Sequence, residues 1–101
     1  MCYVIQGTFM IKTFRCKETE ALFNDRKVLR FQGIENQARR RLLYLNRARV
    51  LQDLKVPPGN ELEALKGDRA GQHSIRINKQ WRVCFVWKDG DAYNVEIVDY
   101  H

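Results

Sequence analysis

The chain has 101 residues, of which 45% are hydrophobic, and 18 lysines and arginines against 12 aspartates and glutamates give it a net charge of +6. This composition excludes a disordered chain, and the length fits one domain with a single modest core. No apolar run could span a bilayer, and the start, MCYVIQGTFMIKTF, lacks the pattern of an export signal. We therefore expect a cytoplasmic protein without a membrane partner.

The charge and the cysteines narrow the class of function further. A basic surface raises nucleic acid as a partner, and the alternative is a basic domain that binds none. The three cysteines, Cys2, Cys16 and Cys84, are odd in number and widely spaced, and the chain has only two histidines. This is neither a disulfide framework nor a metal cluster, so we expect no metal and no cofactor.

The N-terminal part of the chain predicts a strand and a short helix. Residues 10–15, MIKTFR, are a strand candidate, and we treat residues 1–9 as an extension that precedes a single domain of residues 10–101. Residues 17–23, KETEALF, predict a short helix with Thr19 near its start.

Residues 33–54 predict the longest helix, because apolar residues recur there at helical spacing. This stripe consists of Ile34, Ala38, Leu42, Leu45 and Ala48. Arg39, Arg40 and Arg47 fall away from the stripe, and Arg41 lies at its edge. The pattern favours a solvated helix face. The alternative is a contact to nucleic acid or to an acidic partner.

The second half of the chain predicts a small antiparallel sheet. VPPGN at residues 56–60 ends the helix, and a polar loop follows at residues 61–71. The strand candidates are residues 72–78 (QHSIRIN), 81–87 (WRVCFVW) and 92–100 (AYNVEIVDY). The predicted class is α+β, with an N-terminal strand, two helices and a three-stranded antiparallel meander.

The second predicted hairpin decides where the chain end lies. A turn at Asp89 and Gly90 places Arg82 opposite Ile97 and Gln80 opposite Asp99. The last strand then returns beside the turn of the first hairpin, so the C-terminal residues approach Arg82.

The first predicted hairpin raises a question of charge. A turn about Lys79 places Arg76 opposite Arg82, and directly facing like charges destabilise a sheet. An anion such as a phosphate between the two guanidinium groups would relieve this repulsion.

The chain ends in three residues that can move protons, Asp99, Tyr100 and His101. Together with phosphate-binding groups they suit RNA cleavage by the RNA's own 2′-hydroxyl, which needs a base, an acid and countercharge but no metal. His101 can act as acid or base, because an unperturbed histidine has a pKa of about 6.5. Lys66 and Arg82 can hold the phosphate, and Tyr100 can stack on a base.

Each of these residues also has an ordinary interpretation. A terminal histidine can be accidental, Asp99 can pair with an arginine, and Tyr100 can pack at the rim of the sheet. We assign no role to His73, which lies next to Ser74 and is interpreted as an ordinary strand residue. The residues alone leave a nuclease and a binding module as alternatives.

Two stretches, LEALKGDRAGQHSIRINKQWRVCFVW and GDAYNVEIVDYH, resemble the HigB branch of the RelE/ParE superfamily of bacterial toxins. The resemblance runs from Met10 to His101, and its most specific parts are LKGDR, the WR at Trp81 and Arg82, and the terminal DYH. It implies a RelE-like small domain that acts as a ribosome-dependent, metal-independent mRNA endonuclease in the ribosomal A site. It also implies a HigA-type helix-turn-helix antitoxin, through which the pair would contact operator DNA.

The same resemblance implies roles for individual residues. Lys66 and Arg82 would stabilise the phosphate, while Asp99, Tyr100 and His101 would form the catalytic cluster. The resemblance and the charge pattern together predict RNA contacts at Arg39, Arg40, Arg69, Arg76, Lys79 and Gln80.

One position departs from the family pattern. Several relatives have a catalytic histidine followed by proline just before LKGD, where this chain has Glu63 and Ala64. Glu63 could act as the base instead, since a carboxylate does so when its pKa is raised. The alternatives are that His101 acts alone or that Glu63 is only a solvated loop residue.

Two other functions remain open at the level of sequence. One is a ParE-like poison of DNA gyrase, against which Lys66 and the terminal DYH argue. The other is a non-catalytic RNA-binding or co-repressor module.

Overall fold

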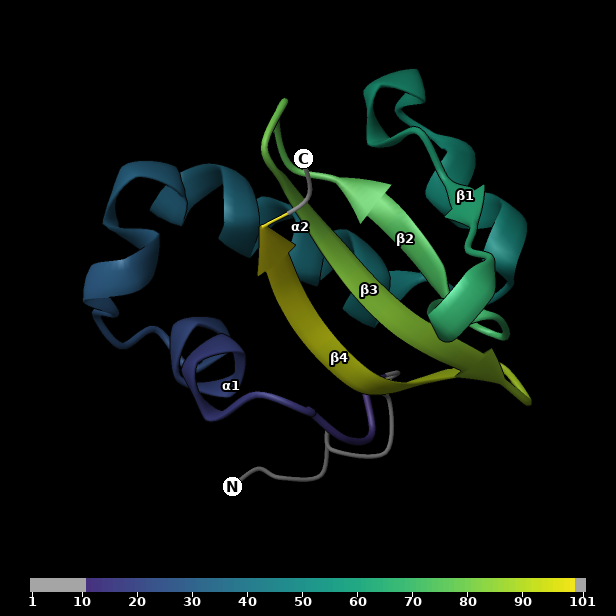
Figure 1. Ribbon diagram of the computed structural model, residues 1–101, viewed down its shortest axis with the longest axis horizontal. Helices are drawn as coiled ribbons and strands as arrows, with labels where there is room; N and C mark the ends of the chain where they lie inside the picture. Colours follow the sequence, from purple (N-terminus) through teal and green to yellow (C-terminus); the bar gives the residue numbers. More distant parts are fainter. Residues whose placement is uncertain (1–10, 100–101) are drawn as a thin grey trace.

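The computed structural model describes residues 11–99, which form two short α-helices, four 3₁₀ helices and one antiparallel sheet (Figure 1). This confirms the predicted α+β class. The elements, with η for a 3₁₀ helix, are α1 (Lys17–Phe23), η2 (Leu29–Ile34), α2 (Glu35–Arg47), η3 (Leu51–Lys55), η4 (Pro58–Asn60), β1 (Glu63–Ala64), η5 (Gly67–Arg69), β2 (His73–Arg76), β3 (Trp81–Lys88) and β4 (Asp91–Asp99).

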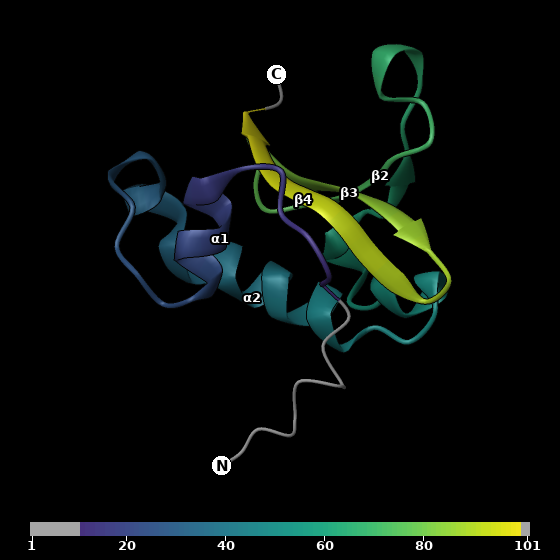
Figure 2. The ribbon, with the colours of Figure 1, turned by 90° about the horizontal axis from the view of Figure 1, so that it is seen from below.

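The sheet has the strand order β1-β2-β3-β4, and the two α-helices cover one of its faces (Figure 2). Figure 2 shows α1 and α2 on one side of the sheet, while the segment around η5 rises on the other side. The core lies between the helices and the sheet, because one face of each element is apolar. Its fully buried larger residues include Leu22, Phe31, Leu42, Leu45, Ile75, Val83, Phe85, Val95 and Ile97.

The predicted meander is present as β2, β3 and β4, and two details differ from the prediction. The short strand β1 lies inside the predicted loop of residues 61–71 and pairs with β2. The predicted N-terminal strand forms only isolated parallel bridges to β4, Ile11 with Ala92 and Phe14 with Val95. Residues 1–9 and Met10 lie outside the described residues, so their assignment as an extension stays a prediction.

The long helix predicted over residues 33–54 is wrong in length, because α2 ends at Arg47. Ala48 is extended, with φ −66° and ψ 133°. The Asp53 carboxylate accepts hydrogen bonds from the backbone N–H groups of Arg49 (2.9 Å) and Val50 (3.3 Å), which would otherwise have continued the helix. These two bonds lower the pKa of Asp53. The apolar stripe is nevertheless buried as predicted.

The arginines of α2 are used differently from one another. Arg41, at the edge of the stripe, donates from Nε to the Arg76 carbonyl oxygen at 2.8 Å and so ties α2 to the end of β2. Arg40 and Arg47 are exposed, as expected. Within residues 11–99 no helix has both the length and the apolar character that crossing a membrane requires.

The register of the second hairpin is as predicted beside the turn and shifts by one residue beyond it. Lys88 pairs with Asp91, but Arg82 pairs with Val98 and not with the predicted Ile97. A β-bulge between Cys84 and Val86 causes the shift, and Asn94, in the bulged part of β4, has φ 53°. Asparagine tolerates this left-handed conformation better than most residues.

Two threonine hydroxyls fasten β4 to the N-terminal part of the chain. Thr19 Oγ1 accepts a hydrogen bond from the Ile97 N–H at 3.0 Å in the core. Thr13 Oγ1 accepts one from the Asn94 N–H at 2.8 Å at the surface. The two bonds are alike in chemistry and differ in their access to water.

We predict that Thr19→Val lowers the free energy of unfolding by about 1–3 kcal/mol, because the Ile97 N–H is left unpaired in the core. Thr13→Val is the matched control and should cost clearly less, since water can replace its hydroxyl. Equilibrium urea unfolding of both variants measures the difference. Equal losses would contradict the assignment of Thr19 as a buried anchor.

Candidate active site on the open face of the sheet

The face of the sheet that points away from α1 and α2, which we call the open face, carries a cluster of polar residues. In strand pairing Arg76 lies opposite Arg82, as predicted, and Ser74 lies opposite Cys84. Directly opposed residues share a face and successive residues alternate, so these side chains point away from the core. The cluster consists of Glu63, Ser74, Arg76, Arg82, Cys84 and Glu96.

Arg82 is buried at the centre of this cluster and is 9% exposed. Its Nε donates to Ser74 Oγ at 2.7 Å, and its Nη2 donates to the Glu61 carbonyl oxygen at 2.6 Å. The Glu63 carboxylate lies 3.7 Å from the same Nη2. The structure therefore brings together the predicted phosphate-binding residue Arg82 and the predicted base Glu63.

Glu61 links the two facing arginines. Its backbone is left-handed, with φ 45°, a conformation uncommon outside glycine. In this conformation its carbonyl oxygen meets Arg82 while its carboxylate binds Arg76 Nη1 at 2.9 Å. The repulsion between the two guanidinium groups is thus offset by acidic residues of the chain itself.

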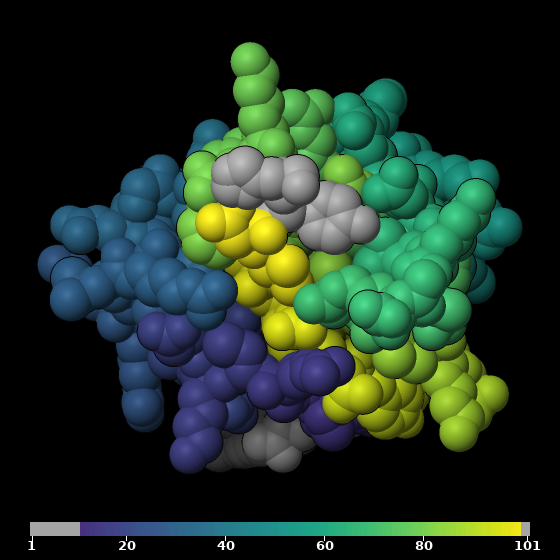
Figure 3. All heavy atoms as spheres, viewed as in Figure 1, coloured from purple at the N-terminus to yellow at the C-terminus, as the bar shows by residue number. Residues whose placement is uncertain are grey.

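The segment between β1, which carries Glu63, and β2 is fastened across the open face. Arg69 Nη1 donates to Glu96 Oε1 on β4 at 3.1 Å and to Gln72 Oε1 at 3.0 Å. In the space-filling view, atoms of the segment around η5 stand beside those of β4 on this face (Figure 3). Lys66 lies exposed at the start of η5, three residues after Glu63.

The C-terminal cluster is only partly described by the structure. Asp99 is the last residue of β4 and pairs with Trp81, so the predicted pairing with Gln80 is wrong by one residue. The two side chains still meet, because Gln80 Nε2 donates to Asp99 Oδ2 at 3.2 Å. Tyr100 and His101 lie outside the described residues, so their position in the site stays a prediction.

The remaining predicted RNA contacts fall on two different sides of the molecule. Lys79 is exposed in the turn beside Gln80, near the end of β4. Arg39 and Arg40 lie on α2, which is on the other side of the sheet from the open face (Figure 2). The Arg39 guanidinium binds the carbonyl oxygens of Leu22 (3.1 Å) and Arg26 (3.0 Å), so it ties α2 to the segment after α1.

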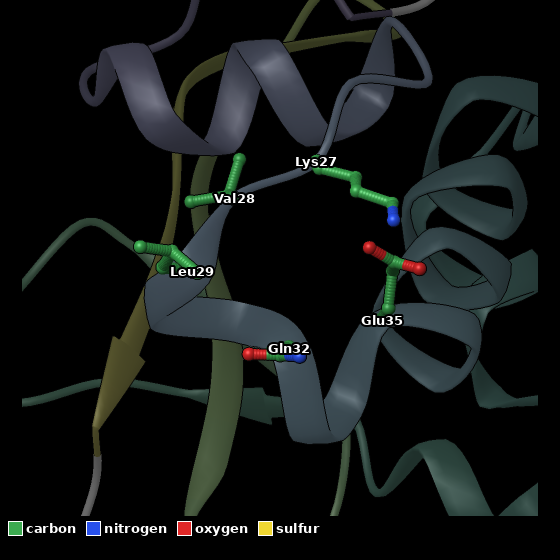
Figure 4. Close-up of a pocket in the computed structure, with 5 residues that line it drawn as sticks. All are labelled: Lys27, Val28, Leu29, Gln32 and Glu35. Atoms are coloured by element: carbon green, nitrogen blue, oxygen red, sulfur yellow. The ribbon is translucent and has the colours of Figure 1, made fainter.

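A hollow of about 270 Å³ lies on the helix side of the sheet (Figure 4). Lys27 and Glu35 point toward each other across it, and the Leu29 side chain is 86% exposed. Its two charges compensate each other, so this hollow lacks the cationic character of a phosphate site. It is lined by Lys27, Val28, Leu29, Gln32 and Glu35.

Reasoning from sequence missed Ser74 and Glu61. The signal for Ser74 was available, because the turn about Lys79 already places Ser74 diagonally next to Arg82, within reach of a long side chain. Glu61 gave no signal, since its contribution depends on a backbone carbonyl and a left-handed φ.

Cys84 is a fully buried member of this cluster and lies opposite Glu96 in strand pairing. Burial raises the pKa of its thiol, and the nearby Arg69 opposes this only in part. Since the thiolate is the reactive form, a raised pKa leaves less of it at a given pH.

We predict that iodoacetamide at pH 8 alkylates Cys84 more slowly than the half-buried Cys16, and that urea removes the difference. Peptide mass spectrometry over time separates the sites. Equal rates in the folded protein would show that Cys84 is not shielded.

Comparison with solved structures shows which proteins share this fold. A structure of the YoeB–YefM toxin–antitoxin complex from Staphylococcus aureus aligns with a TM-score of 0.54 at 17% identity, over 90% of this chain and 97% of that chain. A further YoeB–YefM structure from Staphylococcus aureus gives a TM-score of 0.53 over the same shares. At this identity the likeness shows the fold alone.

Comparison of sequences is more specific. Residues 12–101 match the family described as RelE-like toxin of type II toxin-antitoxin system HigB. Toxin HigB-1 of Vibrio cholerae serotype O1 is 42% identical over 87 residues, which are 84% of this chain and 92% of that toxin. Endoribonuclease HigB of Proteus vulgaris is 46% identical over 41 residues, 41% of this chain and 45% of that enzyme. The chain belongs to the HigB family of RelE-like toxins of type II toxin–antitoxin systems, which confirms the resemblance stated above.

Proposed function

We propose that this HigB-family toxin is an endoribonuclease that cuts mRNA in the A site of the translating ribosome. The observation that carries the proposal is the Arg82 guanidinium, held on the open face by Ser74 and Glu61 with the Glu63 carboxylate 3.7 Å away. The similarity to Endoribonuclease HigB of Proteus vulgaris supports the same reaction class. A substrate on translating ribosomes places the toxin in the cytoplasm.

In the proposed reaction the 2′-oxygen of one nucleotide attacks the adjacent phosphorus. The P–O2′ bond forms, the P–O5′ bond breaks, and a 2′,3′-cyclic phosphate and a 5′-hydroxyl result. Glu63 takes the 2′-proton, and the cluster of Asp99, Tyr100 and His101 returns a proton to the leaving 5′-oxygen. Arg82 and Lys66 stabilise the negative charge that builds up on the phosphate.

Substrate entry requires an exchange of ion pairs on the open face. In the free protein Arg76 binds the Glu61 carboxylate at 2.9 Å. An incoming RNA phosphate replaces this carboxylate, so the two guanidinium groups become partners of the RNA backbone. Arg69, Lys79 and Gln80 extend the RNA contacts along the rim, and Arg39 and Arg40 on α2 face ribosomal RNA.

The proposed partner is a HigA-type antitoxin with a helix-turn-helix domain, and operator DNA is contacted only through it. Membership of a type II toxin–antitoxin family supports an antitoxin partner. Growth arrest by the toxin alone, relieved by co-expression of a helix-turn-helix protein encoded beside it, tests this pairing.

We predict that Arg82→Ala lowers the cleavage rate constant by about 10²- to 10³-fold, because a preorganised donor to the charged phosphate is lost. Primer extension on a reporter mRNA, with and without its start codon, measures cleavage and its dependence on translation. Lys88→Ala is the matched control, since Lys88 is exposed at the far end of the same strand.

Three results would contradict parts of this proposal. Cleavage by Arg82→Ala at the wild-type rate would show that Arg82 is not part of the active site. DNA breaks with intact mRNA would favour a ParE-like gyrase poison. RNA binding that weakens steeply with salt, without cleavage or arrest, would indicate a non-catalytic module.

We predict that Glu63→Gln lowers the cleavage rate constant by about 10²- to 10⁴-fold, because an amide cannot accept the 2′-proton. The control is Glu20→Gln, an exposed site on α1. An unchanged rate in Glu63→Gln, with activity lost on deletion of His101, would assign the base to the C-terminal cluster.

A further inference from the structure

Ser74 is a fully buried polar residue on β2 that holds Arg82 but takes no part in the chemical steps proposed above. Its hydroxyl oxygen accepts the hydrogen bond from Arg82 Nε at 2.7 Å, and this bond is buried. A buried hydroxyl beside a guanidinium is a costly group unless it is hydrogen-bonded. The Ser74 hydroxyl is therefore tolerated in its buried position because it is hydrogen-bonded to Arg82.

The geometry of the guanidinium gives this bond a direction. The group is planar and carries five N–H donors in a fixed fork. Nε–H and one Nη2–H lie along one edge, and this is the edge that Ser74 Oγ and the Glu61 carbonyl oxygen hold. Two acceptors on one edge fix both the plane of the fork and the direction of its other edge.

A competing partner lies close by. The Glu63 carboxylate is 3.7 Å from Arg82 Nη2, longer than a good charge-assisted hydrogen bond. Without the Ser74 hydroxyl, a small rotation brings the guanidinium into a direct pair with Glu63. That rotation turns the phosphate-binding edge and also occupies the proposed base.

We propose that Ser74 is a positioning residue for RNA cleavage, which aims the Arg82 guanidinium at the scissile phosphate and keeps it from pairing closely with Glu63. This inference rests on the proposed function. It predicts that Ser74 acts only through Arg82 and makes no contact with the RNA.

The test is a double-mutant cycle on the intact toxin with programmed ribosomes under single-turnover conditions. Ser74→Ala should lower the cleavage rate constant by about 10- to 100-fold, since misplacing a catalytic group by about 1 Å costs up to about 10²-fold. Binding of the toxin to the ribosome should change little. In the Arg82→Ala background, Ser74→Ala should change the residual rate by no more than about twofold.

The controls separate positioning from stability. Ile75→Val, a fully buried neighbour on the core face of β2, should lower thermal stability while the cleavage rate stays near wild type. Ser74→Cys keeps a hydrogen-bonding atom at this position with a larger radius and a weaker acceptor, and it should give a rate between wild type and Ser74→Ala. It also serves if Ser74→Ala does not fold.

Each outcome decides the inference. A wild-type rate in Ser74→Ala, or the same fold-loss in both backgrounds, would overturn the positioning role while the proposed function stands. If the wild-type toxin does not cut mRNA on ribosomes, the proposed function falls and the inference falls with it.

Discussion

The buried hydrogen bonds of Arg82 are the interaction on which the open face depends. A guanidinium in the interior is strongly unfavourable unless acceptors surround it, and this one has a hydroxyl and a carbonyl oxygen at short range. The carbonyl oxygen belongs to Glu61, so the same contact joins Arg82 on β3 to the segment that leads to Glu63 and Lys66. The Arg82 side chain thereby connects the sheet, this segment and the charged groups of both.

The charge balance of the free protein follows from this arrangement. The chain is basic overall, with a net charge of +6, yet the two facing arginines already have carboxylates beside them. In the function proposed above, an RNA phosphate would exchange with these carboxylates, so that binding would depend on the position of the phosphate as well as on charge.

Much of the fold was predictable from local patterns. The apolar stripe of α2 and the Asp89–Gly90 turn specify their elements through short-range physics, and both are present in the structure. The length of α2 was not predictable in this way. The helix ends because the Asp53 carboxylate captures two backbone donors, a competition that helical periodicity does not record.

The candidate site was predictable where strand pairing alone decides it. The facing of Arg76 and Arg82 follows from the first turn. The compensation by Glu61 and Glu63 depends on a left-handed backbone residue and on β1, a strand of two residues that is too short to show a pattern. The pairing predicted from the Asp89–Gly90 turn is correct for the near half of β4 and wrong by one residue for the far half.

That last error has its origin in the bulge at Asn94. Ala92 and Val95 are both buried although an odd number of positions separates them, which a regular strand does not allow. The one inserted residue therefore reverses the face of the sheet to which each later residue of β4 points. As a result Ile97 enters the core and Val98 lies opposite Arg82. Asp99, at the end of β4, therefore owes its pairing with Trp81 to a bulge several residues upstream, and a one-residue deletion there would turn the end of the strand to its opposite face without altering any residue in it.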